Sequence, residues 1–350
     1  MSLPRNVVLV GDARQRLAEL PAGSVDCVVT SPPYFNLRDY GATGQIGLED
    51  HVSSWVDELR LVMRAVARVL KPSGSLWLNV GDAFSRHDRY GAPPKSLLLG
   101  PERLALALLD DGWTVRNRVA WVKQNTMPAS VRDRLACTWE IVYLLTRNRQ
   151  YYFDLDAIRI PHRSAPRAPH RSTPGGYPPK TAIPPAWGGA LSGSHTGLDH
   201  LKARGLVGHP LGKNPGDAWS LPASNFRGQH FATFPTALVT QPLLATCPER
   251  VCHACGEPWQ RQARRDKLGD LRPNCDCHGD WQPGLVLDPF FGAGTVGLVA
   301  EQHGRDWLGI ELNTSFACLA SERIIAARTK STGPNRPSRN KINNRKEITT

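Results

Sequence analysis

A buried strand that runs directly into a glycine-rich turn and a helix is the feature that most limits the folds open to this chain. The stretch GLVLDPFFGAGTVGLVAEQ places Gly292, Gly294 and Gly297 in a G-x-G-x-x-G pattern at this junction. Such a turn lets a ligand approach the backbone and points the N–H groups of a helix N-terminus at it. Glu311 ends the next apolar segment about twenty residues later, where a carboxylate can hold a ribose diol. The pattern predicts a nucleoside-binding α/β unit, with an ordinary tight turn as the alternative.

Apolar segments and helical patterns alternate along both ends of the chain. Segments typical of strands lie at 6–13, 24–34, 75–82, 114–124, 138–148, 284–288 and 306–313. Helical spacing of apolar residues covers 14–20, 53–70, 100–113 and 314–329, and the turn KPSG separates the second of these from a strand. This alternation predicts an α/β sheet.

The charge of the chain favours a polyanionic partner. It carries 43 Lys and Arg against 31 Asp and Glu, which gives a formal charge of +12. Basic residues are frequent in the segment 159–227, which is also rich in Pro, Gly and Ser and shows no clear periodicity. Such a segment is long for a structureless loop in a compact domain, so we favour DNA docking over a plain linker.

A second motif lies near the N-terminus, where the apolar strand DCVV ends in TSPPY. This motif and DPFFGAGT together resemble the paired motifs of amino-group DNA methyltransferases that use S-adenosylmethionine. The catalytic motif precedes the cofactor loop, as in the permuted β group of that family. The resemblance covers about residues 5–155 and 228–325. It implies a Rossmann-like class I methyltransferase fold, circularly permuted, with a mostly parallel seven-stranded sheet.

The resemblance also implies roles for individual residues. The residues that match the catalytic tetrapeptide are Ser31, Pro32, Pro33 and Tyr34. Those that match cofactor-binding positions are Asp12, His230, Phe234, Pro235, Asp288, Pro289, Phe290, Gly292, Gly294, Thr295, Glu311 and Asn313. Asp82 and Lys123 are second-tier candidates, because both lie where strands would end near the site.

The SPPY motif suits methylation of an exocyclic amine. The lone pair of such an amine is delocalised into the base, so the amine is a poor nucleophile. The Ser31 hydroxyl and the Pro32 carbonyl can accept its hydrogen bonds and turn the lone pair toward the methyl group, and proline keeps its C=O although it lacks an N–H. Tyr34 offers a stacking face for a base turned out of the duplex. No catalytic cysteine is required.

A group of cysteines precedes the glycine-rich turn. Cys252 and Cys255 form C-x-x-C followed by glycine, and Cys275 and Cys277 form C-x-C. Four thiolates on two short turns suit a structural zinc ion in a zinc-ribbon-like insert. Cys247 or His278 could replace one ligand, and reduced free thiols are the alternative.

We divide the chain into five parts. They are the catalytic half at 1–158, the basic insert and DNA target recognition region at 159–227, the cofactor-binding half at 228–246 and 283–327, the zinc-binding insert at 247–282, and a disordered basic tail at 328–350. No segment approaches the ~18–20 apolar residues of a membrane span, and the N-terminus lacks the parts of a signal peptide. We therefore expect a cytoplasmic protein without membrane contact, associated with the nucleoid through DNA.

These features together predict a site-specific methyltransferase that acts on the N4 amine of cytosine in double-stranded DNA. Serine at the first position of SPPY is similar to cytosine-N4 enzymes, whereas adenine-N6 enzymes more often carry Asp or Asn there. N6-adenine methylation on the same scaffold is the first alternative. A nucleotide-dependent oxidoreductase and a non-catalytic zinc-ribbon DNA binder are less favoured. A cognate restriction endonuclease and a homodimer are further expected partners.

Overall fold

The computed structural model describes residues 3–126, 128–161, 209, 211–223, 234–264, 267–277 and 279–331. Contacts divide the chain into two units. The first comprises Met1–Phe153, Asp217–Trp259 and Pro273–Thr350, and the second comprises Asp154–Gly216 and Gln260–Arg272. Within the described ranges, no helix is long and apolar enough to cross a membrane.

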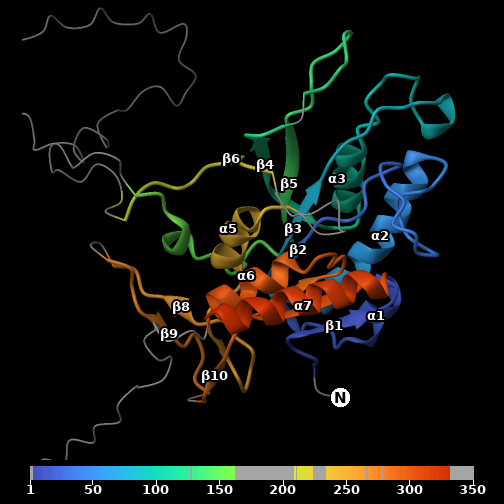
Figure 1. Ribbon diagram of the computed structural model, residues 1–350. Helices are drawn as coiled ribbons and strands as arrows, with labels where there is room; N and C mark the ends of the chain where they lie inside the picture. The colour runs from blue at the N-terminus through green and yellow to red at the C-terminus, as the bar shows by residue number, and fades with distance from the viewer. Residues whose placement is uncertain are drawn as a thin grey trace, which may run out of the picture. The chain divides into compact units, whose positions relative to one another are not determined.

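The first unit contains an eight-stranded sheet in the order β1-β12-β11-β2-β3-β5-β4-β6 (Figure 1). Its strands are β1 (Val7–Val10), β2 (Val25–Thr30), β3 (Leu70–Val80), β4 (Thr114–Lys123), β5 (Trp139–Thr146), β6 (Ala218–Leu221), β11 (Leu285–Asp288) and β12 (Asp306–Glu311). All neighbours pair in parallel except β5, which is antiparallel to both β3 and β4. The late strands β11 and β12 therefore lie between the early strands β1 and β2, as a permuted order requires.

Helices cover both faces of this sheet. One face carries α1 (Ala13–Glu19), α2 (Val52–Val69) and α3 (Gly100–Asp110), and the other carries α5 (Thr236–Thr246), α6 (Thr295–His303) and α7 (Thr314–Ser331) (Figure 1). Successive side chains of a strand point to opposite faces of the sheet, so the protein has one hydrophobic core on each face. Val28 packs with α1 to α3, whereas its neighbour Val29 packs with α5 to α7. A sheet covered on both faces explains why all six residues of β2 are buried.

The structure adds three details to the predicted pattern. Strand β3 begins at Leu70, so the residues KPSG belong to the strand and do not separate the helix from it. Next to these residues, the pairing of β2 with β3 shifts register between Val25 and Cys27. Strand β6 is an eighth strand that its short sequence of four residues did not predict. Helix α7 extends to Ser331, into the segment where we expected disorder.

The second unit is small in its described part. It contains the 3-10 turn η2 (Leu155–Ile158) and the antiparallel pair of β8 (Gln260–Arg261) with β9 (Leu271–Arg272). Arg261 donates a 2.7 Å hydrogen bond to the buried carboxylate of Asp154. Most of the predicted basic insert lies outside the described residues.

Candidate active site

Strands β2 and β11 bring the two sequence motifs together. They pair in parallel, with Val286 opposite Cys27, so their carboxyl ends meet at the same edge of the sheet. There the Thr30 hydroxyl donates a 2.6 Å hydrogen bond to Asp288. Asp288 is 1% exposed, and this burial raises the pKa of its carboxyl to about 7. SPPY and the glycine-rich turn therefore begin side by side.

A cavity of about 410 Å³ opens at this edge and is lined by both motifs. The predicted residues that line it are Asp12, Ser31, Pro32, Pro33, Tyr34, Phe234, Pro289, Phe290, Gly292, Thr295, Glu311 and Asn313. Three predicted residues, Asp288, Gly294 and Pro235, are not among the lining residues, and His230 lies outside the described residues. Asp288 lies instead beneath the turn, where its carboxylate also accepts from the backbone N–H of Phe290.

Glu311 holds the glycine-rich turn from the end of β12. One carboxylate oxygen accepts the N–H of Gly292 at 2.7 Å, and the other accepts the N–H of Asn313 at 2.9 Å. Burial raises the pKa of Glu311. Gly292 has a φ of +51°, a left-handed conformation that glycine adopts without strain. Each carboxylate oxygen keeps a lone pair for a ligand hydroxyl.

Asp12 also lines the cavity, at the N-terminus of α1, and the N–H of Gly11 just before it bonds the Glu311 carbonyl at 2.9 Å. Its carboxylate caps that helix by accepting the N–H of Arg14 at 2.8 Å. The Arg14 side chain also bonds this carboxylate and lowers its pKa. Asp12 is thus held as an anion.

The SPPY turn is fixed by two residues from outside the motif. The indole N–H of Trp55, in α2, donates to the Pro33 carbonyl at 2.9 Å. Gly81, just after β3, packs against Tyr34 so closely that a Cβ there would lie 2.5 Å from its ring. The ring of Tyr34 is therefore held in one place at the wall of the cavity.

A polar cluster surrounds the Tyr34 hydroxyl, and the sequence indicated only one of its other members, Lys123. The hydroxyl donates to Glu140 at 2.8 Å, and the Asn79 amide donates to the same carboxylate at 3.2 Å. Lys123 forms an ion pair with Glu140 and, like the other three, lines the cavity. Asp82, in contrast, accepts the N–H groups of Leu99 and Gly100 at the start of α3 and is not a lining residue. Of the two second-tier candidates, only Lys123 reaches the cavity.

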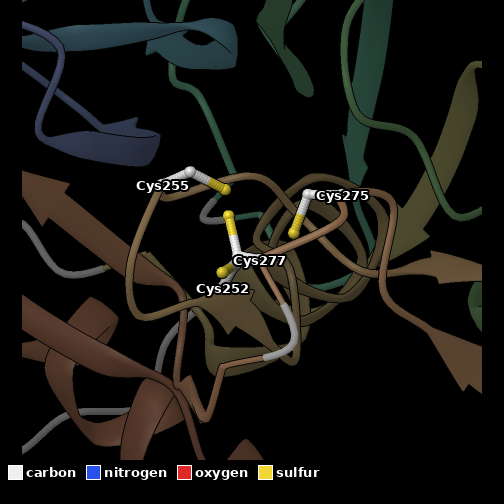
Figure 2. Close-up of side chains that lie close together, drawn as sticks. All are labelled: Cys252, Cys255, Cys275 and Cys277. Atoms are coloured by element: carbon white, nitrogen blue, oxygen red, sulfur yellow. The ribbon is translucent and has the colours of Figure 1, made fainter.

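The four predicted metal ligands gather at one point in the first unit. The sulfur atoms of Cys252, Cys255, Cys275 and Cys277 lie within 4.8 Å of one another, and Figure 2 shows them turned toward a common centre. Cys247 is fully buried in the apolar core and is not part of this cluster, and His278 lies outside the described residues.

The surroundings of this cluster, including the neighbouring sulfur atoms, shift the pKa values of its thiols. The backbone N–H groups of Cys255 and Ala254 lower the pKa of Cys252 to about 7. The neighbouring sulfur of Cys255, and after it that of Cys275, raises the pKa of Cys277 to about 12. If all four were ionised, thiolates so close together would repel one another, and a divalent cation at their centre would remove that repulsion.

Fold and site define the class of protein as a DNA methyltransferase, and comparisons with known proteins agree. The model of the DNA methylase family (N6_N4_Mtase) matches residues 25–322. The type II methyltransferase M.SmaI of Serratia marcescens is 33% identical over 342 residues, which cover 92% of this chain and 91% of that protein. The chain belongs to the DNA methylase family, and DNA is its substrate. This membership leaves the oxidoreductase and the non-catalytic binder without support.

Two solved structures share the fold. The cytosine-N4-specific PvuII DNA methyltransferase superposes with a TM-score of 0.55 at 17% identity, covering 94% of this chain and 93% of that one. A putative DNA modification methylase of Thermus thermophilus, in complex with S-adenosyl-L-methionine, gives 0.52 at 23% identity, covering 92% and 93%. These likenesses confirm the predicted Rossmann-like class I methyltransferase fold.

Proposed function

We propose that the protein transfers a methyl group from S-adenosylmethionine to the N4 amine of a cytosine that has been turned out of double-stranded DNA. The observation that carries this proposal is the shared cavity: Tyr34 of SPPY and Gly292 of the glycine-rich turn both line it. A methyl donor held on one side can there meet a base held on the other, which is the positioning that such a transfer needs.

The glycine-rich half of the cavity suits the nucleoside of the donor. The Glu311 carboxylate would accept hydrogen bonds from the ribose hydroxyls, and Phe290 and Phe234 add apolar walls. Asp12 adds a second carboxylate near Glu311 that would accept further hydrogen bonds from the donor. When bound, the donor supplies an electrophilic methyl group on a positively charged sulfur.

The SPPY half suits the target base. The Ser31 hydroxyl and the Pro32 carbonyl would accept the two N–H bonds of the amine, which frees its lone pair to face the methyl group. Because Trp55 and Gly81 fix the turn, these acceptors are in place before the base arrives. The half-buried ring of Tyr34 would stack on the extruded base.

Analysis of the methylated product tests the proposal directly. DNA treated with the protein and S-adenosylmethionine is digested to nucleosides, which are separated and weighed. N4-methyldeoxycytidine is the expected product, and N6-methyldeoxyadenosine alone would replace the cytosine assignment with the adenine alternative. Mapping of methylated positions on the same DNA would give the recognition sequence.

We further propose that the cysteine cluster binds a structural zinc ion. Its ligands would be Cys252, Cys255, Cys275 and Cys277, a donor set typical of closed zinc sites. The strands in the described part of this insert are only two residues long: β7 (Val251–Cys252) pairs with β10 (Trp281–Gln282), and β8 pairs with β9. A metal ion would supply the cross-link that so small a segment needs to hold its shape.

A further inference from the structure

Methylation of an amine produces a positively charged nitrogen that must release a proton to an acceptor. The product nitrogen carries a positive charge until it loses one hydrogen, and an acceptor close to SPPY would remove that charge. Three acidic residues line the cavity: Asp12, Glu140 and Glu311. Only one of them is connected to the catalytic serine by hydrogen bonds of the described residues.

Asp12 and Glu311 form hydrogen bonds with other groups. The Asp12 carboxylate caps α1 and is bonded to the Arg14 side chain, and no hydrogen bond among the described residues connects it to Ser31. Both oxygens of Glu311 accept backbone N–H groups that fix the glycine-rich turn. Glu311 also belongs to the half of the cavity proposed for the donor, on the side away from the target amine.

Glu140 is connected to Ser31 through a chain of hydroxyl groups. The Ser31 hydroxyl donates to the Tyr34 hydroxyl at 3.4 Å, and the Tyr34 hydroxyl donates to Glu140 at 2.8 Å. The first contact is long, as catalytic hydrogen bonds often are before the substrate binds. The Glu140 side chain is 15% exposed, so a proton that reaches it can pass on to water.

We propose that Glu140 accepts the proton that the target amine releases, and that the hydroxyl groups of Ser31 and Tyr34 carry the proton to it. This proposal rests on the proposed function. It gives Tyr34 two separate roles, because its ring face would stack on the base while its hydroxyl points at Glu140.

The transfer balances in charge and atoms. The nitrogen lone pair becomes the new N–CH₃ bond, and the electrons of the broken S–CH₃ bond stay on sulfur. The positive nitrogen then gives a proton to the Ser31 oxygen, the serine proton moves to the Tyr34 oxygen, and the tyrosine proton moves to Glu140. Ser31 and Tyr34 end as they began, and Glu140 ends as a neutral acid that returns its proton to water.

The neighbours of Glu140 fit this role. Lys123 pairs with one carboxylate oxygen, and the Asn79 amide donates to the other, so the carboxylate is held in a fixed orientation toward Tyr34. The Lys123 ammonium also lies 5.0 Å from the centre of the Trp121 ring, which limits its movement. These contacts hold the Glu140 carboxylate beside the Tyr34 hydroxyl.

The test compares Glu140→Gln with wild-type protein in a single turnover, with DNA and S-adenosylmethionine bound beforehand. Glutamine keeps an oxygen that accepts from Tyr34 but cannot take up a proton at neutral pH. We expect the methylation rate to fall about 100-fold, as for loss of a general base, while the calorimetric Kd for S-adenosylmethionine changes less than about 2-fold. Tyr34→Phe, which keeps the ring and removes the relay hydroxyl, should give a similar loss. Glu102→Gln, outside the cavity, should match wild type.

A second measurement does not depend on rate. In difference infrared spectra, a protonated-carboxyl band should rise with product in wild-type protein and be missing in Glu140→Gln. Formate should partly restore turnover in Glu140→Ala. Wild-type rates in both Glu140→Gln and Tyr34→Phe would overturn the relay and leave the proposed function intact. Absence of N4-methyldeoxycytidine with wild-type protein would instead overturn the proposed function.

Discussion

The Thr30 hydroxyl donates a 2.6 Å hydrogen bond to Asp288, a residue 258 positions away in the sequence. Thr30 is the last residue before SPPY, and Asp288 is the last residue of the strand before the glycine-rich turn. One buried contact thus sets the spacing of the two motifs. Asp288 is itself buried and is not among the residues that line the cavity.

The first prediction concerns the pH dependence of stability through Asp288. Burial raises its pKa in the folded protein from 3.8 to about 7, so its neutral form is favoured there. The resulting stabilisation is complete below about pH 4 and is lost as the pH rises through about 7. Relative to Asp288→Asn, the unfolding free energy of ligand-free wild-type protein should fall by about 2–3 kcal/mol between pH 5 and pH 8. Urea titrations at both pH values measure it.

The control for this prediction is Asp57→Asn, whose side chain is 69% exposed on α2. Its unfolding free energy should follow that of wild type across the same pH range. If wild type and Asp288→Asn showed parallel pH curves, Asp288 would be ionised in the folded protein and the account of its burial would be wrong.

The second prediction concerns Glu311 and the methyl donor. Both carboxylate oxygens of Glu311 accept backbone N–H groups. In Glu311→Gln the side-chain NH₂, which is a donor, would therefore face one of these N–H groups, which is also a donor. We therefore expect Glu311→Gln to weaken S-adenosylmethionine binding nearly as much as Glu311→Ala, by roughly 30- to 100-fold in the calorimetric Kd. Glu322→Gln, exposed on α7, is the matched control. Wild-type affinity in Glu311→Gln would exclude this role.

The sheet could be predicted from the sequence because its strands are strongly marked. β2 has an apolar core of Cys27, Val28 and Val29 before Thr-Ser-Pro-Pro, β11 has Leu285, Val286 and Leu287 before Asp-Pro, and both strands are fully buried. β6 carries only one buried residue, Trp219, and owes its existence to pairing with β4, which no local pattern reveals. Parallel order likewise follows from contacts between distant segments.

The sequence predicted the cavity residues that belong to the two motifs, but it did not indicate Asn79 and Glu140, which also line the cavity. Glu140 is the second residue of β5, and a polar residue at the start of a strand is common in any sequence. Its place beside Tyr34 depends on β5 running antiparallel to β3, which puts the start of β5 at the same edge as the end of β3. The resemblance predicts Asp288 as a cofactor-binding residue, and its buried bond to Thr30 could not be read from the sequence because Thr30 comes from the other end of the chain.

The third prediction concerns Ser31 as an acceptor for the target amine. Ser31→Ala removes the hydroxyl and leaves the Pro32 carbonyl as the acceptor that we expect from the motif. The single-turnover rate should fall about 100-fold or more, because the lost hydrogen bond is made to the reacting group. The Kd for S-adenosylmethionine should barely change. Ser54→Ala, exposed on α2, should behave as wild type, and full activity in Ser31→Ala would contradict the assignment.

The fourth prediction concerns the cysteine cluster. Purified protein should contain about one zinc ion per chain by mass spectrometry of the metal, because four sulfur atoms within 4.8 Å provide one tetrahedral site. Cys275→Ser should lose most of that zinc, whereas Cys318→Ser, exposed on α7 and outside the cluster, should keep it. A strong chelator should lower the unfolding temperature of wild type by about 5 °C or more and leave that of Cys275→Ser unchanged. If zinc-free wild-type protein unfolded at the same temperature with and without added zinc, the four thiols would not bind a stabilising zinc ion.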